Sequence, residues 1–457
     1  MVFNKLQYSK RPNIILISAD TLRADHLGCY GYNINTSPHI DKFSKDAVLF
    51  LNAKSNAYWT VPSHLSLFTS LYPSVFKVWE RQKNIGMLDS SYLTLAKILK
   101  KHGYGTAAFT SGGYVSKDYG FAHSFDVYND DIASKNTKHI TEKIINLGTE
   151  WIKEQKGNFF LFLHTYETHA PYLPPMPFIE EFVVKYTPIS HLTEKHCLIG
   201  LEYSKIGKDA KHWFEKTRDE NFLKTVVALY DGEIKYLDSI ISRLLSKLKR
   251  LGVYDNSIVI FLSDHGEAFY EHGSFGHGNL YEETIRVPLI IHLPKALERY
   301  SGNTIDKIVS LVDVLPTILD ICSISYQPKQ FQGRTLLDLI KNRANSQRNF
   351  SFSEGSEVKA ICSSRYKYIV YDLGEQNERE ELYDLSVDPK ENRNLLGVLA
   401  DDTEIKKTHQ RLRKLLLTQV KRNAALYKKM KKGIRQKTEI ILNKDTKEQL
   451  RALGYMQ

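Results

Sequence analysis

The sequence has few cysteines and no long apolar run. Its 457 residues include only four cysteines, which are spread singly with no C-x-x-C pair. That spacing excludes a zinc ribbon and a disulfide-stabilised scaffold, and indicates reduced thiols. The longest apolar runs, such as residues 13–19 and 258–262, are much shorter than the ~20 residues that a membrane-spanning helix needs. We expect no membrane span and, because Lys5, Lys10 and Arg11 are followed by no recognisable cleavage site, a cytoplasmic protein.

Acidic residues are scarce at the C-terminal end. The chain carries a net charge of +11, and residues 401–457 hold 16 lysines and arginines against 6 aspartates and glutamates. The rest of the chain is close to neutral, which argues against a sequence-specific nucleic-acid binder, because such a protein spreads its charge over a folded face. The basic tail is either a solvated helix face or a contact for an anionic surface such as membrane, polymer or RNA.

The remaining composition, 42% apolar and 25% charged, is typical of a globular protein. Short apolar runs predict strands, and the first of them reads as a central parallel strand buried on both sides. A helical pattern separates the later runs, so we expect an α/β fold with a large, mostly parallel sheet sandwiched by helices. The predicted strands are 13–18, 158–164, 257–264 and 287–293, and the clearest helix is 223–251.

The pattern changes near the polar stretch 342–349. Short strands and a helix follow it, at 358–362, 366–371 and 402–423. We therefore predict a catalytic domain over residues 1–345 and a smaller C-terminal α+β subdomain over residues 346–457, with a small antiparallel sheet and a basic helical tail.

Two predicted strands end in groups that bind metals. Asp264 and His265 follow the strongest strand directly, and carboxylate with neutral imidazole suits Zn²⁺ or Mn²⁺ better than Ca²⁺. Asp20 ends the first strand, where a carboxylate needs a cation or backbone donors. Since ligands of open α/β sheets bind beyond the carboxyl ends of strands, these residues are candidates for one site. A capped turn at Asp264 and a helix cap at Asp20 are the alternatives.

A further candidate lies where residues 59–70 turn from a loop into a helix. Pro62 is favoured at a first helical position, and Thr60 lies just before it. A helix N-terminus favours an oxyanion, and a hydroxyl there can become a nucleophile beside a metal. The alternative is that Thr60 is only the helix N-cap.

Taken together, an ordered set of motifs resembles the sulfatase family of the alkaline phosphatase superfamily. The set covers nearly the whole chain and comprises Asp20, Thr60-x-Pro62-Ser63-His64, Ser263-Asp264-His265-Gly266-Glu267, Tyr281-Glu282-Glu283-x-x-Arg286-Val287-Pro288, residues 311–317, residues 333–336, residues 381–385 with Asp388-Pro389, and residues 450–455.

The resemblance implies an alkaline phosphatase-like fold and one divalent metal ion that activates a nucleophile and binds the substrate oxyanion. It places Asp20, Asp264 and His265 on metal-ligand positions. Thr60 falls on the nucleophile, which also contacts the metal. His169 falls on the histidine that contacts the substrate or protonates the leaving group.

Other matched positions depart from the sulfatase pattern. His277 stands where many sulfatases keep a lysine on the anion, and His64 where they have an arginine, so we expect His64 to orient the loop or the anion. Thr60 replaces the cysteine or serine that formylglycine-dependent sulfatases oxidise, and threonine cannot be oxidised in that way. Thr21 and His265 replace an aspartate and an asparagine, which favours Mn²⁺ or Zn²⁺ over Ca²⁺. Relatives that act on phosphate esters use an unmodified threonine or serine.

The resemblance therefore implies a metal-dependent hydrolase of phosphate or sulfate esters, with phosphoester favoured and the ester carried on a glycan or lipid head group. A phosphoethanolamine or phosphoglycerol transferase acting on a glycan, and a non-catalytic scaffold, are the alternatives. A second metal ion would require Glu167, His169, His272 and His277 to converge.

Overall fold

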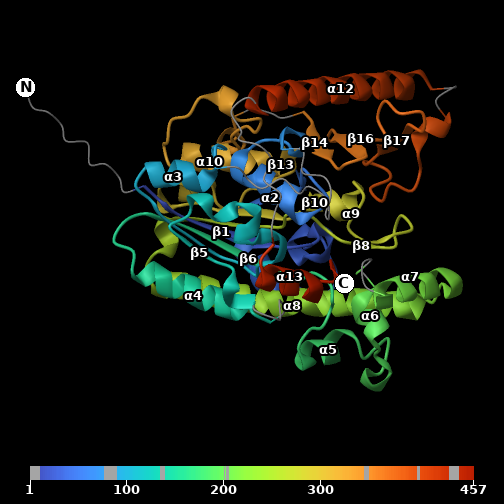
Figure 1. Cartoon of the computed structure of the whole chain (residues 1–457), viewed down its shortest axis with the longest axis horizontal. Helices are drawn as coiled ribbons and strands as arrows, with labels where there is room; N and C mark the ends of the chain where they lie inside the picture. The colour runs from blue at the N-terminus through green and yellow to red at the C-terminus, as the bar shows by residue number, and fades with distance from the viewer. Residues whose placement is uncertain are drawn as a thin grey trace, which may run out of the picture.

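A computed structural model describes residues 11–76, 90–133, 139–199, 201, 205–343, 349–398, 402–431 and 442–456. Its centre is an eight-stranded sheet in the order β12-β2-β11-β7-β1-β6-β4-β5 (Figure 1). All neighbouring pairs are parallel except the two that β11 makes. The strands are β1 (Asn13–Ala19), β2 (Val48–Phe50), β4 (Gly105–Phe109), β5 (Val127–Asn129), β6 (Phe159–Thr165), β7 (Ser257–Leu262), β11 (Leu289–His292) and β12 (Thr304–Ile305).

The predicted central strand is confirmed. Every residue of β1 is buried, and β1 pairs in parallel with β7 on one side and β6 on the other. Its side chains alternate between two cores, so that Ile14 and Leu16 face one core and Ile15 and Ile17 the other. A strand covered on both faces reads as a continuous apolar run because neither set of side chains meets water.

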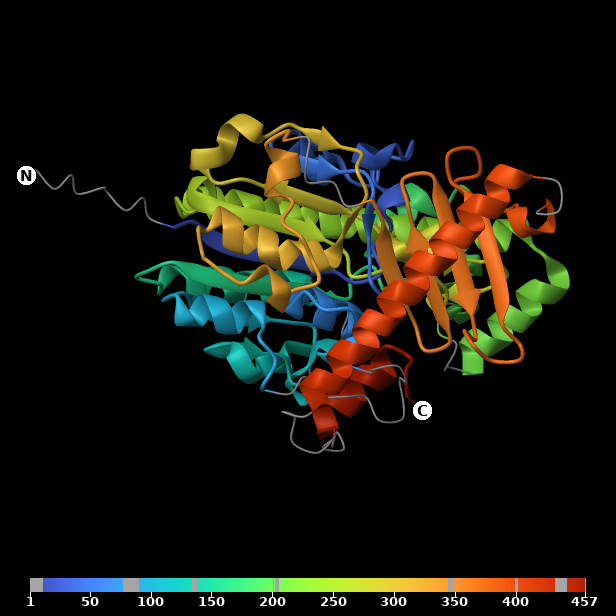
Figure 2. The ribbon, with the colours of Figure 1, turned by 90° about the horizontal axis from the view of Figure 1, so that it is seen from above.

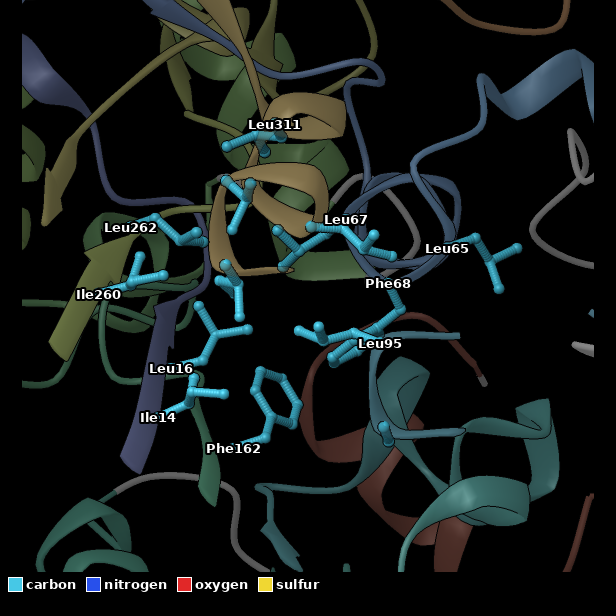
Figure 3. Close-up of a cluster of buried hydrophobic side chains, with 14 of the residues drawn as sticks. Ile14, Leu16, Leu65, Leu67, Phe68, Leu95, Phe162, Ile260, Leu262 and Leu311 are labelled. Atoms are coloured by element: carbon cyan, nitrogen blue, oxygen red, sulfur yellow. The ribbon is translucent and has the colours of Figure 1, made fainter. Parts of the chain in front are cut away.

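Helices cover both faces of the sheet, as predicted. α4 and α8 lie on one face, and α2, α3 and α10 lie on the other (Figure 1). Strand residues Ile14, Leu16 and Phe162 pack toward Leu67 and Phe68 of α2 (Figure 3). The first face has α1 (Pro38–Lys45), α4 (Thr141–Lys153) and α8 (Glu220–Arg250), with α5 (Met176–Phe182), α6 (Glu194–Leu198) and α7 (Lys205–Thr217) beyond; the second has α2 (Thr60–Thr69), α3 (Leu95–Lys101), α10 (Val314–Ile321) and α11 (Leu337–Ile340).

The run predicted at 287–293 is a strand, but it is antiparallel. β11 pairs with β7 in the register Leu289 with Leu262, so that its start lies beside the end of β7. Burial on both faces produces the same apolar run whichever way the strand points. The direction of a strand was therefore not visible in the pattern.

A smaller α+β unit follows, as the predicted fold class requires. Its four-stranded antiparallel sheet has the order β14-β15-β16-β17, and α12 lies across one face of it (Figure 2). Leu412 and Leu416 of α12 are buried against Tyr368 and Phe352. The predicted boundary at residue 345 lies outside the described residues. The elements are β14 (Ser351–Glu354), β15 (Val358–Cys362), β16 (Tyr366–Tyr371), β17 (Arg379–Asp384) and α12 (Thr403–Lys431).

Shorter elements complete the described part of the chain. A three-stranded sheet has the order β10-β3-β13, and β8 and β9 form a hairpin. Over the described residues, no helix has the length and apolar character needed to cross a bilayer. These elements are β3 (Ala53–Lys54), β8 (Ala268–Phe269), β9 (Phe275–Gly276), α9 (Glu282–Ile285), β10 (Arg286–Val287), β13 (Val309–Ser310) and α13 (Lys444–Ala452).

Candidate active site

Asp20 lies where β1 ends in a tight turn. The next residue, Thr21, has a φ of 58°, which is an unusual conformation for a β-branched residue. Its hydroxyl donates to the carbonyl oxygens of Asp20 (2.7 Å) and Thr168 (2.8 Å), and its own carbonyl accepts from Tyr230 (2.8 Å). These contacts hold the strained turn in place and commit the Thr21 hydroxyl to backbone carbonyls.

Asp264 and His265 are held beside Asp20 by a contact between the two strand ends. The Ser263 hydroxyl accepts from Leu22 N (3.0 Å) and donates to the His265 carbonyl (2.6 Å). The chain then passes so close to another segment that a Cβ on Gly266 would lie 2.1 Å from a backbone oxygen. Only glycine fits there, which explains the glycine in this motif.

The side chains of Asp20, Asp264 and His265 form one buried cluster, which we call the metal cluster. One ligand atom from each residue lies within 4.8 Å of the others, and none of the three side chains is exposed. His265 Nε2 lies 3.4 Å from Asp264 Oδ2 and 3.9 Å from Asp20 Oδ1. His265 Nδ1 donates to the Gly266 carbonyl (3.0 Å), so that Nε2 is the ring nitrogen directed at the carboxylates.

The electrostatics of the metal cluster favour a cation. Burial and the neighbouring Asp20 raise the pKa of Asp264 well above its usual value, and Asp264 Oδ2 receives no hydrogen bond from the described residues. Burial lowers the pKa values of the adjacent His64 and His164 to about 3, so both rings are neutral near pH 7. A divalent cation would offset the carboxylate charge, and two carboxylate oxygens with one imidazole nitrogen form a fitting donor set for it.

Thr60 reaches the metal cluster from α2. Its Oγ1 donates to Asp20 Oδ2 (3.1 Å) and lies 3.4 Å from His265 Nε2. The alternative of Thr60 as the helix N-cap is wrong, because α2 begins at Thr60 itself and Trp59 is the N-cap residue. Pro62 is consequently the third helical residue. The Thr60 hydroxyl is therefore directed at the carboxylates and makes no cap.

His64 lies one helical turn behind Thr60. Its Nδ1 is 2.9 Å from the Thr60 carbonyl oxygen and its Nε2 is 3.0 Å from the Ser18 hydroxyl. Nδ1 is also 3.5 Å from Asp264 Oδ2. His64 thus connects the first turn of α2 to the end of β1 and to the metal cluster.

His169 and His277 lie together beside the metal cluster. Their ring centroids are 5.4 Å apart, and the ring of His277 is 4.5 Å from that of His265. His277 Nδ1 donates to Glu267 Oε1 (3.1 Å), and Glu267 Oε2 accepts from the Tyr172 hydroxyl (3.0 Å). The structure therefore brings all the predicted site residues into one region.

Two residues of this region were not predicted as site residues. Glu267 orients His277. It was not predicted as a site residue, although it lies in the same sequence motif as Asp264 and His265. Tyr455 contacts both His169 and His277 from the far end of the chain. The only signal for Tyr455 was its place in the last matched motif, at residues 450–455.

The alternative of a second metal at Glu167, His169, His272 and His277 does not form. The Glu167 carboxylate accepts from Thr141 Oγ1 (2.5 Å), and His272 pairs with Glu283 (2.9 Å). Across the described ranges, the metal cluster is the one group in which three such ligand atoms come together.

Comparison with known proteins finds similarity over most of the chain. The family model described as Sulfatase matches residues 12–324, and the model for the N-sulphoglucosamine sulphohydrolase C-terminal region matches residues 270–422. Arylsulfatase K of Mus musculus is 24% identical over 443 residues, covering 86% of this chain and 77% of that protein. An arylsulfatase of Clostridium perfringens is 24% identical over 496 residues, covering 90% of this chain and 94% of that protein.

Solved structures share the fold. A phosphonate monoester hydrolase of Agrobacterium radiobacter superimposes with a TM-score of 0.71 at 19% identity, over 90% of this chain and 96% of that one. A protein solved in complex with its substrate D-glucosamine-2-N,6-O-disulfate superimposes with a TM-score of 0.73 at 21% identity, over 92% and 99% of the two chains. The predicted fold class is confirmed. Because the Sulfatase model covers more than half of its length, this chain belongs to the sulfatase family of ester hydrolases.

Proposed function

We propose that this protein hydrolyses an anionic ester with Thr60 as the nucleophile, and that it prefers phosphate esters to sulfate esters. The observation that carries the proposal is the position of the Thr60 hydroxyl, which donates to Asp20 Oδ2 at 3.1 Å and lies 3.4 Å from His265 Nε2. A nucleophile needs an acceptor for its proton within hydrogen-bond reach. Asp20 Oδ2 is that acceptor.

The metal cluster would hold one divalent cation through Asp20, Asp264 and His265, with Mn²⁺ or Zn²⁺ favoured. When bound, the cation lowers the pKa of a hydroxyl beside it and neutralises charge on the ester oxygens. The buried carboxylates that share this position support the proposal, since they repel one another without a cation.

The protein residues account for the two halves of the reaction. Thr60 Oγ1 forms a bond to phosphorus as the bond to the leaving oxygen breaks, and the Thr60 proton passes to Asp20 Oδ2. His169 supplies the proton that the leaving alkoxide takes up. Water then attacks the phosphorus of the phosphothreonine and its proton passes to His169. The bond from phosphorus to Thr60 Oγ1 breaks as the proton on Asp20 Oδ2 returns to that oxygen, which releases phosphate and restores Thr60 and His169. His277, oriented by Glu267, faces the anion.

An unmodified threonine is what favours phosphorus. A hydroxyl nucleophile attached to the chain can be released from phosphate by the attack of water on phosphorus, so the cycle closes with no oxidised side chain. The fold of the phosphonate monoester hydrolase of Agrobacterium radiobacter is consistent with phosphorus chemistry on this scaffold.

A sulfate ester is the second candidate substrate. The curated relatives at 24–26% identity are named arylsulfatases, and one structural neighbour was solved with a disulfated glucosamine. Either ester would be anionic, and a glycan could carry it. The exposed basic face of α12 would add attraction for such a carrier through Lys406, Lys407, Arg411, Lys414, Lys421, Arg422, Lys428 and Lys429.

The test is a paired assay on an aryl phosphate monoester, an aryl phosphodiester and an aryl sulfate, with Mn²⁺, Zn²⁺ or Ca²⁺ added. We expect phosphoester cleavage that requires metal and falls about 10⁴-fold in Thr60→Ala. Thr60→Ser keeps a hydroxyl and serves as the matched variant that retains turnover. A faster cleavage of the aryl sulfate than of both phosphoesters would overturn the preference for phosphorus. Full activity of Thr60→Ala would overturn the assignment of Thr60 as the nucleophile.

A further inference from the structure

The hydroxyl of Tyr455 lies between the two substrate-facing histidines. It is 2.5 Å from His169 Nε2 and 3.0 Å from His277 Nε2. The opposite nitrogen of each ring is also engaged, since Nδ1 of His169 contacts the Ala170 carbonyl (2.5 Å) and Nδ1 of His277 contacts Glu267 (3.1 Å). The phenol hydroxyl thus contacts the Nε2 atom of both imidazoles.

A specific turn aims Tyr455 at this point. α13 ends at Ala452, and the chain then reverses through Gly454, which has a φ of 74°. Tyr455 N donates to the Leu450 carbonyl (2.8 Å) and Gly454 N to the Arg451 carbonyl (2.9 Å). These two bonds form a Schellman motif, in which glycine takes the left-handed position. A Cβ at Gly454 would also lie 2.6 Å from the Leu201 side chain.

The body of α13 is hydrogen-bonded to the loops that follow β4 and β5. Gln449 Oε1 accepts from Gly113 N (2.8 Å), and Gln449 Nε2 donates to the Asp130 carbonyl (2.9 Å). The N-cap residue Asn443 accepts from Thr446 N (2.8 Å), and its own backbone N donates to Asp118 (2.9 Å). The helix is capped and anchored at both ends, so the place of Tyr455 is determined by many contacts.

We infer that Tyr455 is a positioning residue of the active site: its hydroxyl holds the Nε2 atoms of His169 and His277 at one point until the ester binds, when the ester oxygens take the place of the phenol at these two nitrogens. This inference rests on the proposed function. It gives the C-terminal segment 443–456 a part in catalysis, because the segment supplies the group that aligns two side chains from distant loops.

The same contact allows an opposite reading. Tyr455 is 4% exposed and Thr60 is fully buried, so a phenol in this place could instead occupy the position of a substrate oxygen and hold substrate out. The two readings predict opposite kinetic effects when the hydroxyl is removed. Loss of an aligning contact lowers kcat, whereas loss of a blocking contact raises kcat/KM.

The test compares Tyr455→Phe with Tyr104→Phe, which also removes one buried hydroxyl. Tyr104 donates to the Pro12 carbonyl (3.1 Å) at the opposite end of β1, away from the metal cluster. We expect kcat of Tyr455→Phe to fall about 10–100-fold with little change in KM, and its pH profile to shift. Mn²⁺-induced stabilisation, measured by the thermal midpoint, should equal that of wild type. Tyr104→Phe should keep the wild-type kcat and pH profile.

A second variant tests the placement of the phenol while keeping its hydroxyl. Gly454→Ala keeps the phenol but strains the turn, so it should lower kcat as Tyr455→Phe does. Wild-type kcat in Tyr455→Phe, or a rise in kcat/KM, would overturn the inference. ¹⁵N spectra of the histidine rings provide a readout that needs no turnover: two ring signals should move in Tyr455→Phe and stay in Tyr104→Phe. If wild type cleaves no ester while these signals move, the proposed function fails and the alignment stands.

Discussion

Among the described residues, two of the buried clusters of charged side chains are balanced in different ways. In the metal cluster, the carboxylates of Asp20 and Asp264 meet imidazoles, including the ring of His265. In the second cluster, which we call the ion cluster, Glu282 and Glu391 meet Lys54 and Lys367. The first cluster brings together carboxylates and imidazoles, and the second brings together carboxylates and lysine ammonium groups.

In the ion cluster, lysine ammonium groups offset the charge of the carboxylates. Lys367 Nζ lies 2.8 Å from Glu391 Oε1 and 3.3 Å from Glu282 Oε1, and Lys54 pairs with Glu282. Burial alone would raise the pKa of Glu282, but Lys54 and Lys367 lower it to about 2. Burial alone would lower the pKa of Lys367, but Glu391 and Glu282 raise it above its usual value. Glu282 and Lys367 therefore stay ionised at neutral pH, whereas burial and the neighbouring Glu282 raise the pKa of Glu391 to about 7 in spite of Lys367.

The difference separates a structural role from a functional one. The ion cluster joins β3 and α9 of the large unit to β16 of the C-terminal unit, and it is complete as it stands. In the metal cluster, burial and Asp20 raise the pKa of Asp264 well above its usual value, and under the proposed function a cation would offset the carboxylate charge. Changes in the metal cluster should alter activity and metal binding, and changes in the ion cluster should alter stability.

The largest effect is expected from Asp264→Asn. This change removes one ligand charge and keeps the shape of the side chain, so ester hydrolysis should fall about 10⁴-fold. Stabilisation by metal should fall as well, because a cation at 100 times its Kd stabilises the wild-type fold by about 2.7 kcal/mol. The thermal midpoint with and without Mn²⁺ measures this, alongside the kinetic assay.

Glu391→Gln is the matched control for Asp264→Asn, because it makes the same kind of change in the ion cluster. It should leave the increase in thermal midpoint on adding Mn²⁺ unchanged. An equal loss of that increase in both variants would contradict the division between the clusters, since it would place the cation in neither cluster specifically.

The next effect is expected from Lys367→Met. The side chain of Lys367 is fully buried, and its removal leaves Glu282 and Glu391 facing each other. Removing one partner of a buried ion pair costs about 3–5 kcal/mol, and urea unfolding measures the loss. The Kd for Mn²⁺ should not change in the protein that remains folded.

The double variant Lys367→Met with Glu391→Gln tests the cause of this loss. It removes one charge of each sign, so it should recover part of the lost free energy of unfolding. Additive losses in the two single variants would show that charge pairing is not what Lys367 contributes.

The sequence allowed the metal cluster to be predicted but not the ion cluster. Asp20 and Asp264 each follow a continuous apolar run, and parallel strands bring such ends to one edge of a sheet. Lys54, Glu282 and Lys367 carry no comparable signal, because they meet only through the packing of three separate segments. The site role of Tyr455 was not predicted for the same reason, since Tyr455 meets His169 and His277 only through packing of the C-terminal segment. The direction of β11 and the first residue of α2 depend on tertiary contacts, and the cytoplasmic location and the domain boundary stay predictions.

The smallest effect concerns His64, which supports the metal cluster from behind Thr60. Its ring contacts the Thr60 carbonyl (2.9 Å) and the Ser18 hydroxyl (3.0 Å), and burial lowers its pKa to about 3. His64→Asn therefore changes no charge near pH 7. It shortens the side chain, so that the contacts of the ring with the Thr60 carbonyl and the Ser18 hydroxyl are lost.

Because these contacts hold the first turn of α2 in place, we expect kcat to fall about 10–100-fold in His64→Asn, with the Kd for Mn²⁺ unchanged. Ser18→Ala is the control, since it releases only Nε2 of His64 and leaves the bond to the Thr60 carbonyl in place; it should cost less. A weakened Kd for Mn²⁺ in His64→Asn, with kcat at saturating metal restored to the wild-type value, would show that His64 acts on Asp264, 3.5 Å away, and not on the nucleophile.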